Sequence, residues 1–189
     1  MKKMKILLKR ISLFLIIFCL ILVSTGCSEE KKTESSDTDV TGTTTVKQTI
    51  VDDSFDKNGT GMLKCNTKAE AGDGIDVDLN YSVKYKNGNI LELISIQKVT
   101  SDNQDSLDLY ENAYKNIAKN YDGLNYYDKN IVRDSNSVTY TITINYDKID
   151  LKKLLAIEGA EDNIVKSGKA KLSLWLELAG KMGTTCEEV

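Results

Sequence analysis

The 189-residue sequence contains no histidine and no proline. Histidine is the side chain that most often exchanges protons near neutral pH and most often ligates metals. Its absence excludes Ser–His and Cys–His catalytic pairs and any histidine-bound zinc site. Without proline, turns must be formed by glycine, asparagine, aspartate and serine. The commonest catalytic centres are thus excluded.

The N-terminal segment has the pattern of a secretory signal. Residues 1–10 carry five basic side chains and no acidic one, and the stretch Ile11–Val23 carries no charge. That stretch is shorter than the roughly 20 apolar residues of a membrane-spanning helix, but it is typical of the apolar core of a signal peptide. Ser24, Thr25 and Gly26 then precede Cys27. The pattern predicts a signal peptide over residues 1–26.

The junction at Cys27 resembles the lipobox of bacterial lipoproteins. In that family the cysteine sulfur receives a diacylglyceryl group and a peptidase cuts just before it. The resemblance implies lipidation of Cys27 and a domain at the extracytoplasmic face of the cell membrane, held there by two acyl chains. Ser24 stands where the family most often has leucine. An uncleaved signal anchor is the alternative.

Removal of residues 1–26 leaves 20 basic and 28 acidic residues, a net charge of −8. An acidic domain is a poor partner for nucleic acid or anionic lipid headgroups, so we expect contact with the membrane only through the lipid on Cys27. Residues 28–45 are polar and charged, which predicts a flexible tether over residues 27–57. Residues 46–57 could instead form an edge segment. A single domain is expected over residues 58–189.

Four cysteines are present, of which Cys19 leaves with the signal and Cys27 is the lipidation site. Cys65 and Cys186 remain, near the two ends of the domain. They predict a disulfide in this disulfide-permissive location, which would close a loop of roughly 120 residues and stabilise the fold by about 4–5 kcal/mol. Two free buried thiols are the alternative, since two cysteines are too few for a metal site.

Alternating apolar and polar residues predict two antiparallel hairpins. The first pairs residues 75–86 with a strand that begins after the Asn87-Gly88 turn, with Tyr81 expected opposite Ile94 and Leu79 opposite Ile96. The second pairs residues 125–133 with 138–148. Further strands are expected at 60–69 and 184–189, placing Cys65 beside Cys186.

Helical spacing predicts a helix that opens at Ser101, with Gln104 completing a capping box and Gly123 at its end, and a short helix capped by Asp150. Residues 167–183 fit helix or strand, and their composition favours helix. Together the predicted strands and helices indicate an α+β domain. It has a mostly antiparallel sheet of two hairpins plus terminal strands, covered on one face by two to three helices.

The segments YENAYKNIAKNYDGLNYY and VTYTITINYDKIDLKKLL, followed by a terminal helix and Gly-x-x-Cys, resemble the small YehR-like bacterial lipoproteins. That resemblance covers roughly residues 60–186 and implies a lipobox, a short tether and one α+β domain. The function of that family is unknown, so the resemblance assigns no catalytic residue.

The apolar run around the single tryptophan offers a candidate surface. Leu172, Trp175 and Leu176 could form a partly exposed patch for a protein partner or a small apolar ligand. Alternatively they cover the sheet from a helix.

Other candidates are weaker. Asp76, Asp78 and Asn80 resemble the start of a calcium loop without its glycine and glutamate, and the adjacent Tyr126-Tyr127 could stack on a sugar. Two acids could serve a glycoside hydrolase, but the sequence singles out no pair. We therefore expect no catalytic residue, no metal and no cofactor. The expected function is a non-catalytic binding or interaction module of the cell envelope; a ligand groove between sheet and helix is the alternative, and an acid-dependent envelope hydrolase ranks third.

Overall fold

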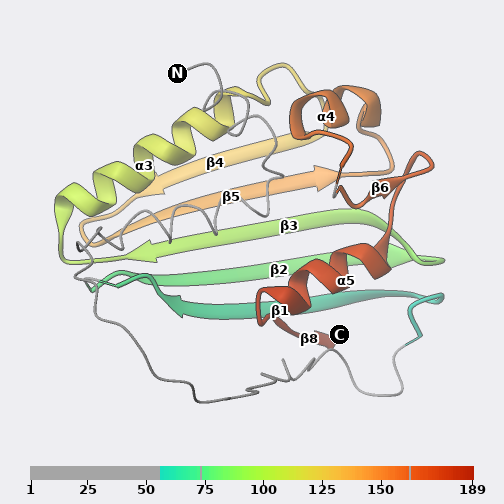
Figure 1. Ribbon diagram of the computed structural model, residues 1–189, viewed down its shortest axis with the longest axis horizontal. Helices are drawn as coiled ribbons and strands as arrows, with labels where there is room; N and C mark the ends of the chain where they lie inside the picture. Colours follow the sequence, from blue (N-terminus) through green and yellow to red (C-terminus); the bar gives the residue numbers. More distant parts are fainter. Residues whose placement is uncertain (1–55, 73, 162) are drawn as a thin grey trace, which may run out of the picture.

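The computed structural model describes residues 56–72, 74–161 and 163–189. In these residues a six-stranded antiparallel sheet has the strand order β4-β5-β3-β2-β1-β8 (Figure 1). Its strands are β1 (Thr60–Glu70), β2 (Asp76–Lys86), β3 (Asn89–Thr100), β4 (Tyr127–Arg133), β5 (Ser137–Asn145) and β8 (Thr185–Glu188). A small hairpin consists of β6 (Val165–Lys166) and β7 (Lys169–Ala170). The helices are α3 (Gln104–Lys119), α4 (Leu151–Glu158) and α5 (Leu172–Lys181).

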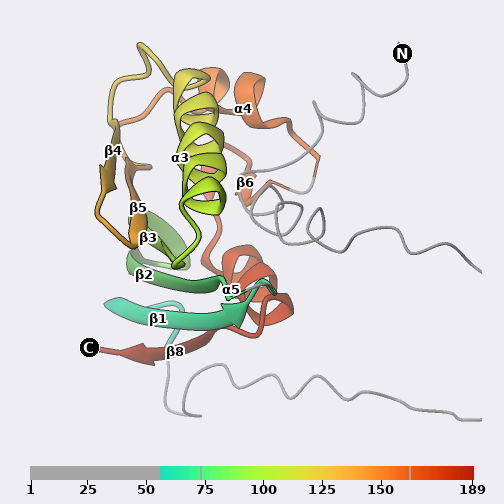
Figure 2. The ribbon, with the colours of Figure 1, turned by 90° about the vertical axis from the view of Figure 1, so that its left-hand side faces the viewer.

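All three of these helices lie on one side of the sheet, which gives the sheet a covered face and an open face (Figure 2). The covered face carries the core, including Leu63, Val83, Leu93 and Ile142, each at most 1% exposed. The expected α+β architecture of two hairpins, two terminal strands and one helical layer is thereby confirmed. No helix within the described ranges has the length and apolar run needed to cross a membrane.

The Asn87-Gly88 turn forms as predicted, because both residues adopt the positive φ angles of a two-residue hairpin turn, 50° and 71°. The register beyond it differs from the prediction. Lys86 faces Asn89 and Tyr85 faces Ile90, but Lys84 faces Glu92, so Leu91 is an extra residue on β3. The Leu91 carbonyl accepts the backbone N–H of Tyr146, which gives the bulged residue a hydrogen-bond partner.

After this bulge, the side chains of β3 that were predicted to face the core face outward, and the others face inward. Tyr81 lies opposite Ser95 and Leu79 opposite Gln97, so the predicted pairs with Ile94 and Ile96 are wrong. Ser95 and Gln97 are buried on the covered face, whereas Ile96 is 39% exposed on the open face. A one-residue shift moves every later side chain of the strand to the other face.

Two helix boundaries also depend on local capping. Helix α3 begins at Gln104, and Asn103 rather than Ser101 is its cap, since Asn103 Oδ1 accepts the N–H groups of Asp105 and Ser106. It ends at Lys119, before the turn that contains Gly123. Asp150 caps α4 as predicted, accepting the N–H groups of the second and third helical residues.

The ambiguous segment 167–183 splits into two elements. Its start forms the turn and second strand of the β6–β7 hairpin, which the sequence analysis did not predict, and the remainder forms α5. Gly183 follows α5 with φ 70°, close to the predicted helix end.

Candidate functional site

The sequence-predicted lipidation site, Cys27, lies outside the described residues, as do residues 27–55 of the predicted tether. The remaining predicted site residues are all described.

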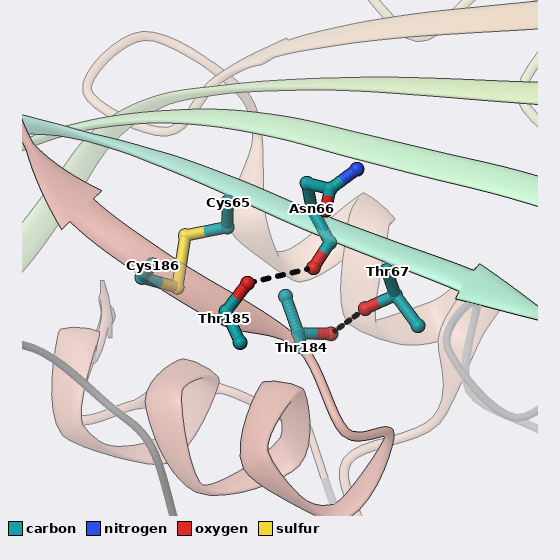
Figure 3. The surroundings of a disulfide bond; sticks show 6 residues. All are labelled: Cys65, Asn66, Thr67, Thr184, Thr185 and Cys186. Carbon is teal, nitrogen blue, oxygen red and sulfur yellow. Dashed lines mark hydrogen bonds between the residues drawn. A yellow bond between two sulfur atoms is a disulfide. The ribbon is translucent and has the colours of Figure 1, made fainter.

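Cys65 and Cys186 form the predicted disulfide between β1 and β8 (Figure 3). They are direct partners in the antiparallel register, with Cα atoms 4.0 Å apart and a sequence separation of 121. Next to them, Thr67 donates a hydroxyl hydrogen bond of 2.5 Å to Thr184. The disulfide thus fastens the C-terminal edge strand, which has only four residues, to the rest of the sheet.

Leu172, Trp175 and Leu176 do not form an exposed patch, which corrects that prediction. Their exposed fractions are 0%, 0% and 9%. They occupy the buried face of α5 at helical spacing, and the Trp175 ring meets Tyr81 of β2 edge-on at 5.6 Å between ring centroids. The helix needs these side chains to cover the sheet, so the alternative interpretation of the apolar run holds.

The remaining sequence candidates are separated by the fold. Tyr127 is buried and stacked on Tyr121 at 4.1 Å, whereas Tyr126 is 51% exposed beneath the Lys148 ammonium group, so the adjacent tyrosines do not form one sugar platform. Asp76, Asp78 and Asn80 lie along the open face of β2. Asp78 is 3.5 Å from Lys68, and no set of three or more acidic or cysteine side chains among the described residues could hold a metal ion.

Among the described residues, one carboxylate is buried. Glu158, at the end of α4, accepts hydrogen bonds from Asn163 Nδ2 at 2.8 Å and from the Tyr121 hydroxyl at 3.3 Å. Burial raises the pKa of Glu158, and the two hydrogen bonds partly oppose that rise. Asn163 also accepts the Val165 N–H, so Glu158 anchors the segment that follows α4. Neither recess described below is lined by Glu158.

The sheet-end recess is a cavity of about 330 Å³ where the sheet, the start of α4 and the β6–β7 hairpin meet. These elements gather at one end of the sheet, near the β2–β3 turn (Figure 1). The recess is lined by Lys86, Asn87, Asn89, Ile90, Leu91, Tyr146, Asp147, Ile149, Leu151, Gly168, Lys169 and Ala170. Its apolar lining includes the buried side chains of Ile90, Ile149 and Ala170.

Two hairpin turns form one wall of the sheet-end recess. Ser167 and Gly168 have φ angles of 53° and 71°, which repeats the geometry of the Asn87-Gly88 turn. The Asn87-Gly88 turn is joined to the first residue of α5, because the Leu172 N–H donates to the Gly88 carbonyl at 3.0 Å. Lys171 Nζ also donates to Asn89 Oδ1 at 3.0 Å. Hydrogen bonds therefore hold this wall in place.

Charged side chains of both signs surround the sheet-end recess. Lys86, Asp147 and Lys169 are exposed, and none of them forms a salt bridge within the described ranges. Sequence reasoning missed these residues because they come from three distant segments. The Ser-Gly pair between Lys166 and Lys169 was the available signal for the hairpin that brings Lys169 to the recess.

The open-face recess is a second hollow, of about 580 Å³, beside the disulfide. It is lined by Lys64, Cys65, Asn66, Asn80, Tyr81, Ser82, Ile96, Thr185, Cys186 and Glu187. Most of these side chains are polar, and Ile96 is present because of the β3 bulge. Its lining also includes the buried side chains of Cys65 and Tyr81.

No protein-family model and no curated protein matches this chain. Two solved structures are similar to it. The NMR structure of the Escherichia coli YehR protein aligns with a TM-score of 0.48 and 14% identity, covering 70% of this chain and 92% of that one. The NMR structure of a protein from Streptococcus pneumoniae TIGR4 aligns with a TM-score of 0.43 and 15% identity, covering 86% and 100%.

Proposed function

We propose that this chain is a bacterial lipoprotein, anchored by a lipid on Cys27 at the extracytoplasmic face of the cell membrane, and that its domain is a non-catalytic binding module for a small ligand. The anchor is supported by the order of basic segment, apolar segment, small residues and cysteine at residues 1–27. Two acyl chains hold a protein on a bilayer far more firmly than one.

The sheet-end recess is the observation that carries the binding function. Its lining combines buried apolar side chains with charged side chains that form no salt bridge within the described ranges, a combination found in small-molecule sites. A non-catalytic binding or interaction module was the leading expectation, but the apolar residues at Trp175 that were expected to contact a partner are buried. The small-ligand version is therefore the better supported of the two.

The anchor is tested by growing cells with an alkyne-labelled palmitate and following the chain in membrane fractions. We expect label and membrane association for the wild type, and loss of label with retention of the signal peptide for Cys27→Ala. Cys65→Ala is the matched control and should keep the label. Labelled Cys27→Ala would refute the anchor.

The binding function is tested by thermal unfolding of the full chain in detergent micelles against a panel of sugars, amino acids, peptidoglycan fragments, lipids and divalent metals. A ligand at 100 times its dissociation constant stabilises the folded state by about 2.7 kcal/mol. A binding module should return its ligand unchanged after incubation, as measured by mass spectrometry. Conversion of the ligand would instead favour the acid-dependent hydrolase.

A further inference from the structure

We infer that the sheet-end recess binds a free α-amino acid with an apolar side chain, with the carboxylate at Lys86 and Lys169 and the ammonium group at Asp147. This inference rests on the proposed binding function and names its ligand. It follows from the size, lining, charge and rigidity of the recess.

The size of the recess favours a very small ligand. Its volume of about 330 Å³ lies at the lower end of the roughly 300–1,000 Å³ typical of small-molecule pockets. A single amino acid suits that volume, whereas a folded partner or a long acyl chain does not.

The lining of the recess favours an apolar body. Ile90, Ile149 and Ala170 are 2%, 6% and 1% exposed. They are hydrocarbon surfaces that present no hydrogen-bonding group to a ligand. A branched aliphatic or thioether side chain would lose contact with water there, which is the main favourable contribution to binding in such pockets.

The charges around the recess favour a zwitterion. Lys86 ends β2, Lys169 begins β7 and Asp147 follows β5, so cations and an anion from three segments surround one cavity. None of the three forms a salt bridge with another described residue. A purely anionic ligand would satisfy the lysines but meet Asp147, and a purely cationic one would meet two lysines. A ligand with one carboxylate and one ammonium group satisfies both signs.

The third lysine near the recess is already engaged, because Lys171 donates to Asn89 Oδ1. That contact and the hydrogen bond from Leu172 N–H to the Gly88 carbonyl hold the wall in place. A preformed wall reduces the ordering cost of binding.

The test is isothermal titration calorimetry of the full chain in detergent micelles with L-leucine, N-acetyl-L-leucine, L-leucinamide and the dipeptide Leu-Leu. We expect saturable binding of L-leucine and at least tenfold weaker binding of the other three. The acetyl compound lacks the ammonium group, the amide lacks the carboxylate, and the dipeptide separates the two charges.

Three exposed substitutions locate the charges. Lys86→Gln, Lys169→Gln and Asp147→Asn should each weaken L-leucine binding at least tenfold, with unchanged circular dichroism. Asp147→Asn should leave N-acetyl-L-leucine unaffected, and the lysine variants should leave L-leucinamide unaffected. Lys64→Gln, at the open-face recess, is the matched control and should bind L-leucine as the wild type does.

The possible outcomes distinguish failure of the amino-acid inference from failure of the proposed small-ligand binding function. Absence of leucine binding, together with stabilisation by another panel compound that Lys86→Gln abolishes, would overturn the amino-acid ligand and keep the binding function. Equal binding of Leu-Leu would overturn it in favour of a peptide terminus. Leucine binding that survives all three substitutions would overturn this site. No response to any compound would overturn both proposals.

Discussion

The Tyr85 hydroxyl group on β2 donates a hydrogen bond of 2.5 Å to the Glu188 carboxylate on β8, across the strand that lies between them. That intervening strand, β1, carries Gly61 at the crossing point. A Cβ atom at Gly61 would lie 2.6 Å from both the Tyr85 oxygen and Glu188 Oε1. The glycine is therefore required by the close approach of the hydrogen bond, and its own φ angle is not positive.

We predict that Gly61→Ala destabilises the fold by about 1–3 kcal/mol, the usual cost of inserting a methyl group into filled space. Urea unfolding followed by circular dichroism measures it. In a Tyr85→Phe background the same substitution should cost less, because one of the two clashing oxygens is gone. An equal cost in both backgrounds would contradict the proposed contact.

The disulfide between Cys65 and Cys186 should contribute a large part of the stability. Closing a loop of this length is worth about 5 kcal/mol in the chain-entropy model. Reduction of the wild type, or the double change Cys65→Ala and Cys186→Ala, should lower the urea midpoint substantially. The double variant is its own control, since a reducing agent should no longer shift its midpoint. An unchanged midpoint after reduction would mean that β8 adds little to the fold.

The bulge at Leu91 can be tested by two matched substitutions on β3. Leu93 is 1% exposed and Ile96 is 39% exposed. We expect Leu93→Ala to cost about 2–5 kcal/mol, as buried leucine truncations do, and Ile96→Ala to cost much less. The uninterrupted register predicted from sequence would give Ile96 the larger cost. Comparing the loss of unfolding free energy in the two variants decides between the bulged and the uninterrupted register.

The sequence predicts what is encoded locally. Strand β2 alternates over its whole length, and Asn87-Gly88 is a strong turn signal, so the first hairpin and its first two residue pairs follow from a short window. The bulge does not, because Leu91 gains its partner from Tyr146, more than fifty residues away. The spacing of Ile90, Ile94 and Ile96 even favours the unbulged register.

The sheet-end recess lies further beyond sequence reasoning. Lys86, Asp147 and Lys169 line the same recess only because the β6–β7 hairpin packs near the β2–β3 turn. The disulfide was predictable despite its length, because only two cysteines remained once the N-terminal pair had been assigned. The exposure of Trp175 was ambiguous, because an apolar run in the sequence does not show which of its side chains are buried against the sheet.

The burial of Trp175 gives a direct spectroscopic prediction. As the single tryptophan, it should show a blue-shifted emission maximum and weak quenching by acrylamide in the folded chain, with both changing on unfolding. Trp175→Ala should cost about 3–5 kcal/mol. Leu109→Ala, at a side chain that is 64% exposed on α3, is the control and should be nearly neutral. Strong quenching in the folded chain would mean that Trp175 is exposed, as the predicted patch required.

The buried carboxyl group of Glu158 makes stability depend on pH with a definite sign. Burial raises its pKa above the ordinary value of 4.5, so the folded chain retains a proton that the unfolded chain releases. Stability from this group is therefore fully present below pH 4.5 and is lost as the pH rises through the raised pKa. Subtracting the unfolding free energy of Glu158→Gln from that of the wild type isolates this effect from the other acids. The difference should fall as the pH rises above 4.5. A difference that rises with pH would mean that Glu158 is stabilised as a carboxylate by its hydrogen bonds with Asn163 and Tyr121, which would then outweigh the cost of its burial.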